Sequence, residues 1–182
     1  MTRFARGEGG VRSWRLGART RKGFLVAHVA SAGAWIGIDV VMGVLVFTAL
    51  VGGGERRALC YRALELFAVW PLIATGLACL ASGVVLGLGT KWGLIRYWWV
   101  AIKLALSVLL VALAPIALRP EVVEKTEQGR RFMAGESASL AVGDLIFPPM
   151  VSPSLLLVAF VLAVFKPWGR IRWTRAQRQR DG

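Results

Sequence analysis

Three residues that could take part in chemistry share one face of the first apolar segment. His28, Trp35 and Asp39 stand inside a run of 28 almost wholly apolar residues, Phe24 to Val51. At 100° per helical residue, the three fall within about 40° of one another. An imidazole and a carboxylate in such a place could pass protons, and ionisable groups inside a membrane span are costly enough to make a functional role the default hypothesis. We therefore expect the functional site on this face.

Lys103 is a second candidate because it also lies deep in an apolar segment. It follows Tyr97 by six residues, about 9 Å of helix, and His28 follows Phe24 by four, about 6 Å. If both segments begin at the same membrane face, the two side chains share a level. Two other interpretations remain: Lys103 could extend its stem to the lipid headgroups, and His28 could be an interfacial histidine. Asp39 would lie about 16 Å deeper than His28, too far to pair with it.

Four apolar segments must position these side chains. They cover about residues 24–51, 59–88, 97–118 and 140–165, and each is near or above the roughly 20 residues that cross a hydrocarbon core as helix. The composition agrees, since 56% of residues are hydrophobic and 18% are charged, with a mean hydropathy of +0.59. Barrel strands would instead be segments of about ten residues with alternating polarity. The sequence predicts an all-α, polytopic membrane protein whose domain, 24–165, is a bundle of four transmembrane helices.

The distribution of charge predicts the orientation. The net charge is +13, and the tails 1–23 and 166–182 together hold thirteen basic and two acidic residues. Basic residues that flank spans stay on the cytoplasmic side, so we expect both termini to be cytoplasmic. Residues 119–139, with four bases and four acids, should form an outer loop. This assignment leaves unexplained three arginines near the first outer turn: Arg56, Arg57 and Arg62.

The basic tails also bear on partners and location. Their role as topology signals makes a nucleic-acid partner unnecessary, so we expect none. The expected partners are the lipid bilayer and, at the tails, anionic lipids. The predicted location is the cytoplasmic membrane, as a multi-pass protein.

Prolines interrupt the fourth apolar segment. Ser152 is placed to cap a helix that begins at Pro153. Such a helix, ending at Phe165, would have 13 residues, about 20 Å, which is too short to cross alone. Residues 140–151 should therefore complete the crossing as a kinked or re-entrant stretch.

Glycine pairs predict close approach between helices. Gly33 and Gly37 form a G-x-x-x-G pattern on the first segment, and Gly83 and Gly87 form another on the second. The first pair lies about 140–180° from His28 around a helix. We expect this glycine face to pack on a neighbouring helix while the His28 face looks into the bundle or toward a ligand. A homo- or hetero-oligomer in the membrane is a further option.

The cysteines, Cys60 and Cys79, predict neither a disulfide nor a metal site. Nineteen helical residues separate them by about 28 Å, and no cysteine and histidine pattern has the spacing of a zinc site. The sequence also contains no hydrolytic triad, phosphate loop or paired-carboxylate site. These absences favour a non-catalytic protein over an enzyme.

Three stretches resemble the bacterial integral-membrane family called domain of unknown function 2269. They read HVASAGAWIG from His28, LGTKWGLIRYWWVAIKL from Leu88 and VFKPWGR from Val164, and in this order they span about Phe24 to Arg170. The resemblance implies a four-helix membrane protein and no particular activity.

A more distant similarity implies a cofactor. A histidine followed seven residues later by a tryptophan, here His28 and Trp35, and a Trp-x-x-x-Lys-Leu motif containing Lys103 are similar to copper-resistance D proteins and four-helix membrane protoporphyrinogen oxidases. That similarity implies haem, with His28, Trp35 and Lys103 as candidate binding residues. The oxidases' further histidines are replaced here by Ala114-Pro115-Ile116, and His28 is the only histidine. A second haem ligand would have to be Met42 or Met150, or come from another chain.

Three functions therefore compete. The first is a non-catalytic bundle, auxiliary or ligand-binding, and the sparse ionisable residues favour it. The second is a haem-binding or porphyrin-redox protein that uses His28 and Lys103. The third is permeation of protons or copper ions past His28 and Asp39, although a lone histidine without a Met or Cys cluster argues against copper.

Overall fold

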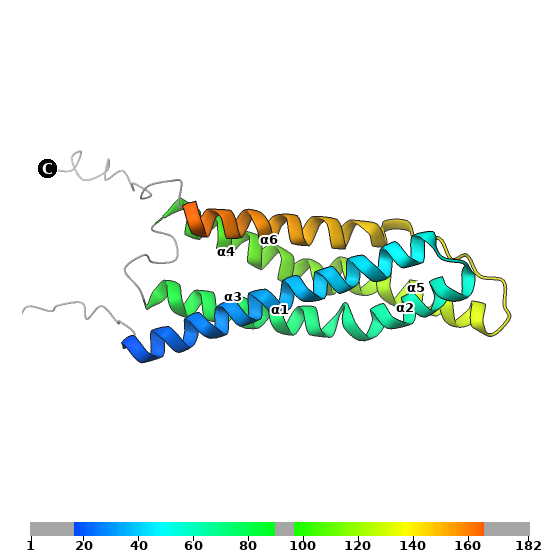
Figure 1. Ribbon diagram of the computed structural model, residues 1–182, viewed down its shortest axis with the longest axis horizontal. Helices are drawn as coiled ribbons and strands as arrows, with labels where there is room; N and C mark the ends of the chain where they lie inside the picture. The colour runs from blue at the N-terminus through cyan, green and yellow to red at the C-terminus, as the bar shows by residue number, and fades with distance from the viewer. Residues whose placement is uncertain (1–16, 90–96, 166–182) are drawn as a thin grey trace, which may run out of the picture.

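The computed structural model describes residues 17–89 and 97–165, and this part of the chain is all-helical (Figure 1). Its elements are α1 (Ala18–Val51), α2 (Gly54–Phe67), α3 (Trp70–Leu88), α4 (Trp98–Leu113), a π-helical turn η1 (Ala114–Leu118), α5 (Arg119–Met133), a 3-10 turn η2 (Gly143–Ile146) and α6 (Phe147–Phe165). Four stretches are long and apolar enough to cross a membrane: Ala18–Val51, Gly54–Leu88, Trp98–Met133 and Gly143–Phe165. The predicted all-α fold with four candidate spans is confirmed. Most of the predicted basic tails, 1–16 and 166–182, lies outside the described residues.

The four candidate spans form an antiparallel bundle (Figure 1). α1 packs on α3 and α6, and α4 packs on the same two helices, so the helices form a ring of neighbours. Trp35 and Met42 of α1 are buried at its centre, whereas apolar side chains such as Phe47 and Phe160 are exposed on the outside. An apolar outer surface of helices with satisfied backbones suits a lipid environment.

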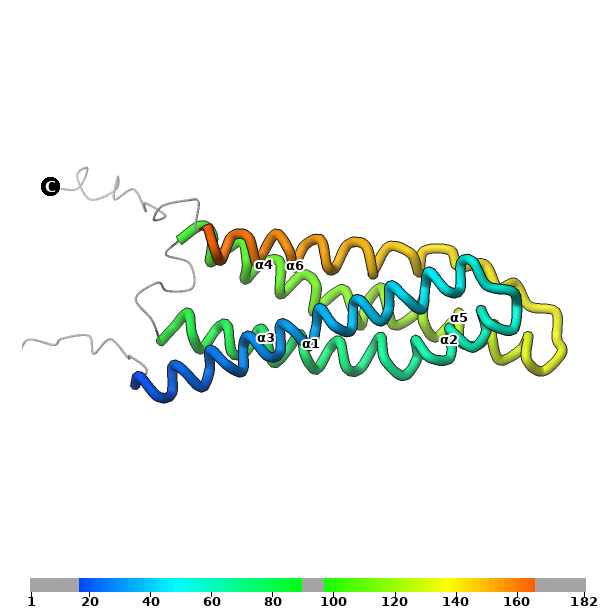
Figure 2. The backbone as a smooth tube through the Cα atoms, in the orientation of Figure 1, coloured from blue at the N-terminus to red at the C-terminus, as the bar shows by residue number. Residues whose placement is uncertain are grey.

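α2 and α5 extend the bundle beyond the length that a membrane requires (Figure 2). The stretch Gly54–Leu88 has 35 residues, about 52 Å of helix, whereas a hydrocarbon core is about 30 Å thick. Its apolar half, α3, and the last helix, α6, have 19 residues each, about 28 Å. α2 and α5 carry most of the charged residues of the described chain, so the end of the bundle that they form is polar.

The segment expected as an outer loop, 119–139, is therefore mostly the helix α5. Pro120 lies just after η1, in a helical stretch that runs without a break from Trp98 to Met133. Glu121 pairs with Lys125 and Glu127 with Arg131, at the i, i+4 spacing that stabilises helices. The opposite face packs on α2: Thr126 Oγ1 donates a hydrogen bond to the Tyr61 carbonyl (3.1 Å). Hydropathy alone does not detect such a polar helix.

Arg57 closes the turn between α1 and α2. Its Nε donates to the Ala49 carbonyl (2.8 Å), and its guanidinium also donates to the carbonyls of Gly52 (3.2 Å) and Leu140 (3.1 Å). A cation at the carboxyl end of α1 satisfies carbonyls that have no helical partner. Arg57 is one of the three arginines that the predicted orientation leaves unexplained. These hydrogen bonds give it a structural role.

The prolines of the fourth segment do not divide it as predicted. α6 begins at Phe147 and runs to Phe165 with Pro153 inside it. Pro148 and Pro149 fall in its first turn, which tolerates proline because the N–H groups there have no helical partner. Ser152 does not cap a helix at Pro153; its hydroxyl instead bonds to another helix.

Candidate functional site

His28 and Lys103 line the same cavity, as the spacing of the sequence predicts. This cavity, here called the basic cavity, has a volume of about 480 Å³. It lies between the first turns of α1, the last turns of α3 and the first turns of α4. Its lining residues are Arg21, Lys22, Leu25, His28, Cys79, Leu80, Gly83, Leu86, Gly87, Trp99, Val100, Lys103, Leu104 and Ser107.

The imidazole of His28 is oriented by the backbone of α3. Its Nδ1 lies 2.9 Å from the Cys79 carbonyl oxygen and 3.1 Å from Ser82 Oγ. A carbonyl oxygen can only accept, so Nδ1 carries the proton and donates it. In the neutral ring the proton-free nitrogen is then Nε2, which has no hydrogen-bond partner among the described residues. This is the arrangement in which histidines bind metals, with one ring nitrogen held by a carbonyl and the other open.

Gly83 makes room for this histidine. A Cβ atom built on Gly83 would lie 3.1 Å from His28 Cε1, tighter than ordinary van der Waals contact. Gly83, the first glycine of the predicted pair on the second segment, therefore lies where α3 closely approaches the imidazole of His28. The pair on the first segment differs: a Cβ on Gly33 or Gly37 meets nothing within 4 Å. Within the described chain, that glycine face of α1 does not pack on a neighbouring helix.

The charge in the basic cavity has one sign. Arg21, Lys22 and Lys103 line it together with His28, and no acidic residue is among its lining residues in the described chain. None of the ion pairs between described residues involves Lys103. The walls are otherwise largely apolar, with leucines from α1, α3 and α4. A cationic group beside apolar walls is suited to an anionic amphiphile.

Trp35 and Asp39 do not line the basic cavity. Both are 1% exposed; Trp35 lines a different cavity, and Asp39 Oδ2 accepts a hydrogen bond from Ser152 Oγ (2.7 Å). The structure thus brings together two of the predicted residues, His28 and Lys103, and separates the other two from them. The sequence offered no signal for Ser152 as the partner of Asp39, because the two are 113 positions apart in the chain.

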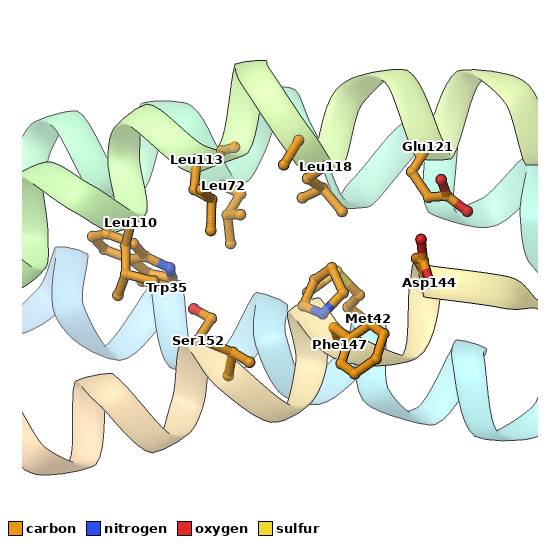
Figure 3. A pocket seen from close by; sticks show the side chains of 14 residues that line it. Trp35, Met42, Leu72, Leu110, Leu113, Leu118, Glu121, Asp144, Phe147 and Ser152 are labelled. Atoms are coloured by element: carbon orange, nitrogen blue, oxygen red, sulfur yellow. The ribbon is translucent and has the colours of Figure 1, made fainter.

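The second cavity, here called the acidic cavity, has a volume of about 390 Å³ (Figure 3). It shares no residue with the basic cavity. Its lining residues are Trp35, Met42, Leu72, Leu110, Leu113, Ala114, Ala117, Leu118, Glu121, Asp144, Phe147, Pro148, Val151 and Ser152. One of the methionines considered as a haem ligand, Met42, lies here, and the other, Met150, lines neither cavity.

Searches of known protein families, of characterised proteins and of solved structures find no match to this chain. Among residues 17–89 and 97–165, no three side chains of His, Cys, Asp or Glu gather in a way that could hold a metal ion. Cys60 and Cys79 are both buried and free. The basic cavity is the candidate site because His28 and Lys103 both line it.

The hydrogen bond between Asp39 and Ser152 should stabilise the packing of α1 on α6. A double-mutant cycle of Asp39→Ala and Ser152→Ala is expected to give a coupling energy of about 0.5–1.5 kcal/mol, the range for hydrogen bonds between membrane helices. Unfolding in mixed micelles of increasing SDS content measures it. Ser154→Ala serves as the matched control because Ser154 Oγ donates to the Met150 carbonyl of its own helix (2.6 Å). Coupling of Asp39 to Ser152 no larger than its coupling to Ser154 would contradict the bond.

Proposed function

We propose that this chain is a multi-pass protein of the bacterial cytoplasmic membrane with both termini on the cytoplasmic side. Four helices that are long and apolar enough to cross a membrane support the first part. The basic tails support the orientation. In this orientation the basic cavity, with Arg21 and Lys22 near the start of α1, faces the inner leaflet, and α2 and α5 extend outward.

Cysteine labelling tests the orientation. In a chain whose native cysteines are replaced by alanine, Ser137→Cys, in the exposed segment after α5, should react with a membrane-impermeant maleimide on intact cells. Gln179→Cys in the carboxyl-terminal tail should react only after permeabilisation. The reverse pattern would invert the orientation.

We further propose that the protein is a non-catalytic bundle that binds an anionic amphiphile in the basic cavity. The observation that carries this proposal is the convergence of His28 and Lys103 with Arg21 and Lys22 on one cavity. Its volume, about 480 Å³, lies within the roughly 300–1,000 Å³ of ordinary ligand sites. The cations would hold the anionic group, and the leucines of the walls would hold the apolar part.

Binding of radiolabelled dodecanoate to the purified protein in neutral detergent tests the proposal. We expect saturable binding of one dodecanoate per chain, with dodecylamine and dodecan-1-ol as poor competitors, because only the carboxylate pairs with the cations. Equal competition by all three would show that the cavity takes an alkyl chain of any charge, and would contradict the proposal.

Haem is a second candidate ligand, and the His28 tautomer favours it. The Nδ1–H donated to Cys79 leaves Nε2 for the iron, and Lys103, Arg21 and Lys22 match the propionates. Bound there, haem would supply redox or gas-binding chemistry at its iron. The described lining residues include one imidazole and no methionine, so a second ligand would not come from Met42 or Met150.

The absorption spectrum of protein purified from haem-sufficient cells, with and without dithionite, decides between these ligands. A Soret band that His28→Ala removes or shifts would identify haem held by His28. A spectrum without a Soret band would exclude haem and leave dodecanoate-like ligands.

A further inference from the structure

The acidic cavity has a definite structural origin. Pro115 lacks the N–H that would bond to the Val111 carbonyl, and the helix widens into the π-helical turn η1 at this point. Ala114 and Ala117 of this turn line the cavity with small side chains, facing Phe147 and Val151 of α6. Such turns inside helices occur often at functional sites. The widened turn and the small side chains keep α4 and α6 from closing on each other here.

An unpartnered polar group points into this cavity. Trp35 is 1% exposed, and its Nε1 has no hydrogen-bond partner among the described residues. Figure 3 shows the indole nitrogen directed into the cavity, beside Leu110 and Ser152. The Ser152 hydroxyl is already engaged with Asp39. A buried N–H without a partner is costly, so a ligand with a hydrogen-bond acceptor at this position would remove that cost.

The other end of the cavity is negatively charged. Glu121 of α5 and Asp144 of η2 line it, and their carboxylates point toward one another in Figure 3. Glu121 Oε1 is 3.4 Å from Lys125 Nζ, whereas Asp144 takes part in no ion pair between described residues. No basic residue is among the lining residues in the described chain. This end therefore favours a cation, opposite in sign to the ligand of the basic cavity.

We propose that the acidic cavity binds a long-chain cation that carries an oxygen acceptor far from its charge. The ammonium pairs with Asp144 beside Glu121, the chain lies along Leu113, Leu118 and Phe147, and the oxygen accepts the Trp35 Nε1–H. Asp144 precedes Ser152 by eight residues, about 13 Å along the 3-10 turn η2 and the start of α6, and Trp35 lies beside Ser152 (Figure 3). A chain of about ten to twelve carbons bridges such a distance.

The indole ¹⁵N–¹H resonance of Trp35 reports binding directly. The protein, labelled with ¹⁵N-tryptophan in nanodiscs of neutral phosphatidylcholine, is titrated with 12-aminododecan-1-ol. Dodecylamine, which lacks the oxygen, and 12-hydroxydodecanoate, which reverses the charge, are the matched probes. Trp35→Phe identifies the resonance; if that variant does not fold, substitution of the other seven tryptophans identifies it by elimination.

We expect the amino alcohol to shift the Trp35 resonance saturably, with an affinity at least about tenfold above that of 12-hydroxydodecanoate. Dodecylamine should bind with a much smaller shift of Trp35. Asp144 is exposed, so Asp144→Asn should lower the affinity for the amino alcohol by about fivefold, the effect of losing an exposed ion pair.

Equal affinities for the cationic and anionic probes would overturn the proposal and reduce the cavity to a slot for an acyl chain. A Trp35 resonance that no probe shifts would overturn it as well. Of the two cavities, Trp99 lines only the basic one, so its resonance reports dodecanoate binding there. Failure of binding at one cavity is therefore distinguishable from failure at the other.

Discussion

Lys103→Met is expected to weaken dodecanoate binding by about 10- to 100-fold, and Lys103→Glu to abolish saturable binding. Lys103 is a lining cation that has no ion pair with another described residue, so its charge is available to a ligand. A hydrogen bond to a charged group contributes about 1.5–3 kcal/mol, which corresponds to this range of affinity. Methionine keeps the length and apolar character of the side chain, so its effect isolates the charge.

Lys125→Met is the matched control for this prediction. Lys125 is more buried than Lys103, at 7% exposed, but it lies on α5, pairs with Glu121 and does not line the basic cavity. Its substitution should leave dodecanoate affinity unchanged in the same competition assay. Unchanged affinity in Lys103→Met would mean that Lys103 extends to the lipid headgroups instead, the alternative that the sequence left open.

Gly76→Ala is expected to destabilise the bundle by about 1–3 kcal/mol, the cost of overpacking a filled core. A Cβ there would lie 2.9 Å from Val111 Cγ2 and 3.2 Å from the ring of Trp35. The shortest of these contacts is to Val111, which is β-branched and holds one preferred rotamer in a helix, so it cannot rotate away from the added methyl group. Gly76→Val should destabilise the bundle more than Gly76→Ala. The SDS fraction at half-unfolding measures the stability of both variants.

Gly33→Ala provides the comparison, because a Cβ there meets nothing within 4 Å. Alanine favours helix over glycine by up to about 1 kcal/mol, so this variant should be neutral or slightly stabilised. Equal destabilisation by both substitutions would contradict the packing of Trp35 against Gly76. Destabilisation by Gly33→Ala alone would indicate that another molecule packs on this face of α1.

The sequence predicted the parts of this structure that depend on local order. Hydropathy located the four stretches that could cross a membrane. The number of residues from the start of each apolar segment placed His28 and Lys103 at one level, because both segments begin at the same end of the bundle. Both side chains line one cavity. Helical periodicity also placed Trp35 and Asp39 on the inward face of α1, where both are buried.

The rest depended on contacts that local order does not contain. The partner of Asp39 is on α6, 113 residues away, and the separation of Trp35 from His28 into two cavities follows from how α3, α4 and α6 pack around α1. Pro115 appeared in the sequence only as a replacement for histidine, whereas in the structure it lies in the π-helical turn. Hydropathy did not detect the helix α5 because it is highly charged. Its stability comes from ion pairs along the helix and from packing on α2.

The length of α5 has a practical consequence for the segment that follows it. Fifteen residues from Arg119 to Met133 span about 22 Å, whereas the headgroup layer on one side of a bilayer is only about 5–8 Å deep. In the proposed orientation, the exposed residues around Gly135, whose φ of +82° suits a glycine at the bend, would therefore stand well clear of the lipid surface. An epitope tag inserted between Glu136 and Ser137 would be within reach of an antibody, and because the flanking helices are held by their own contacts, we expect the bundle to tolerate it.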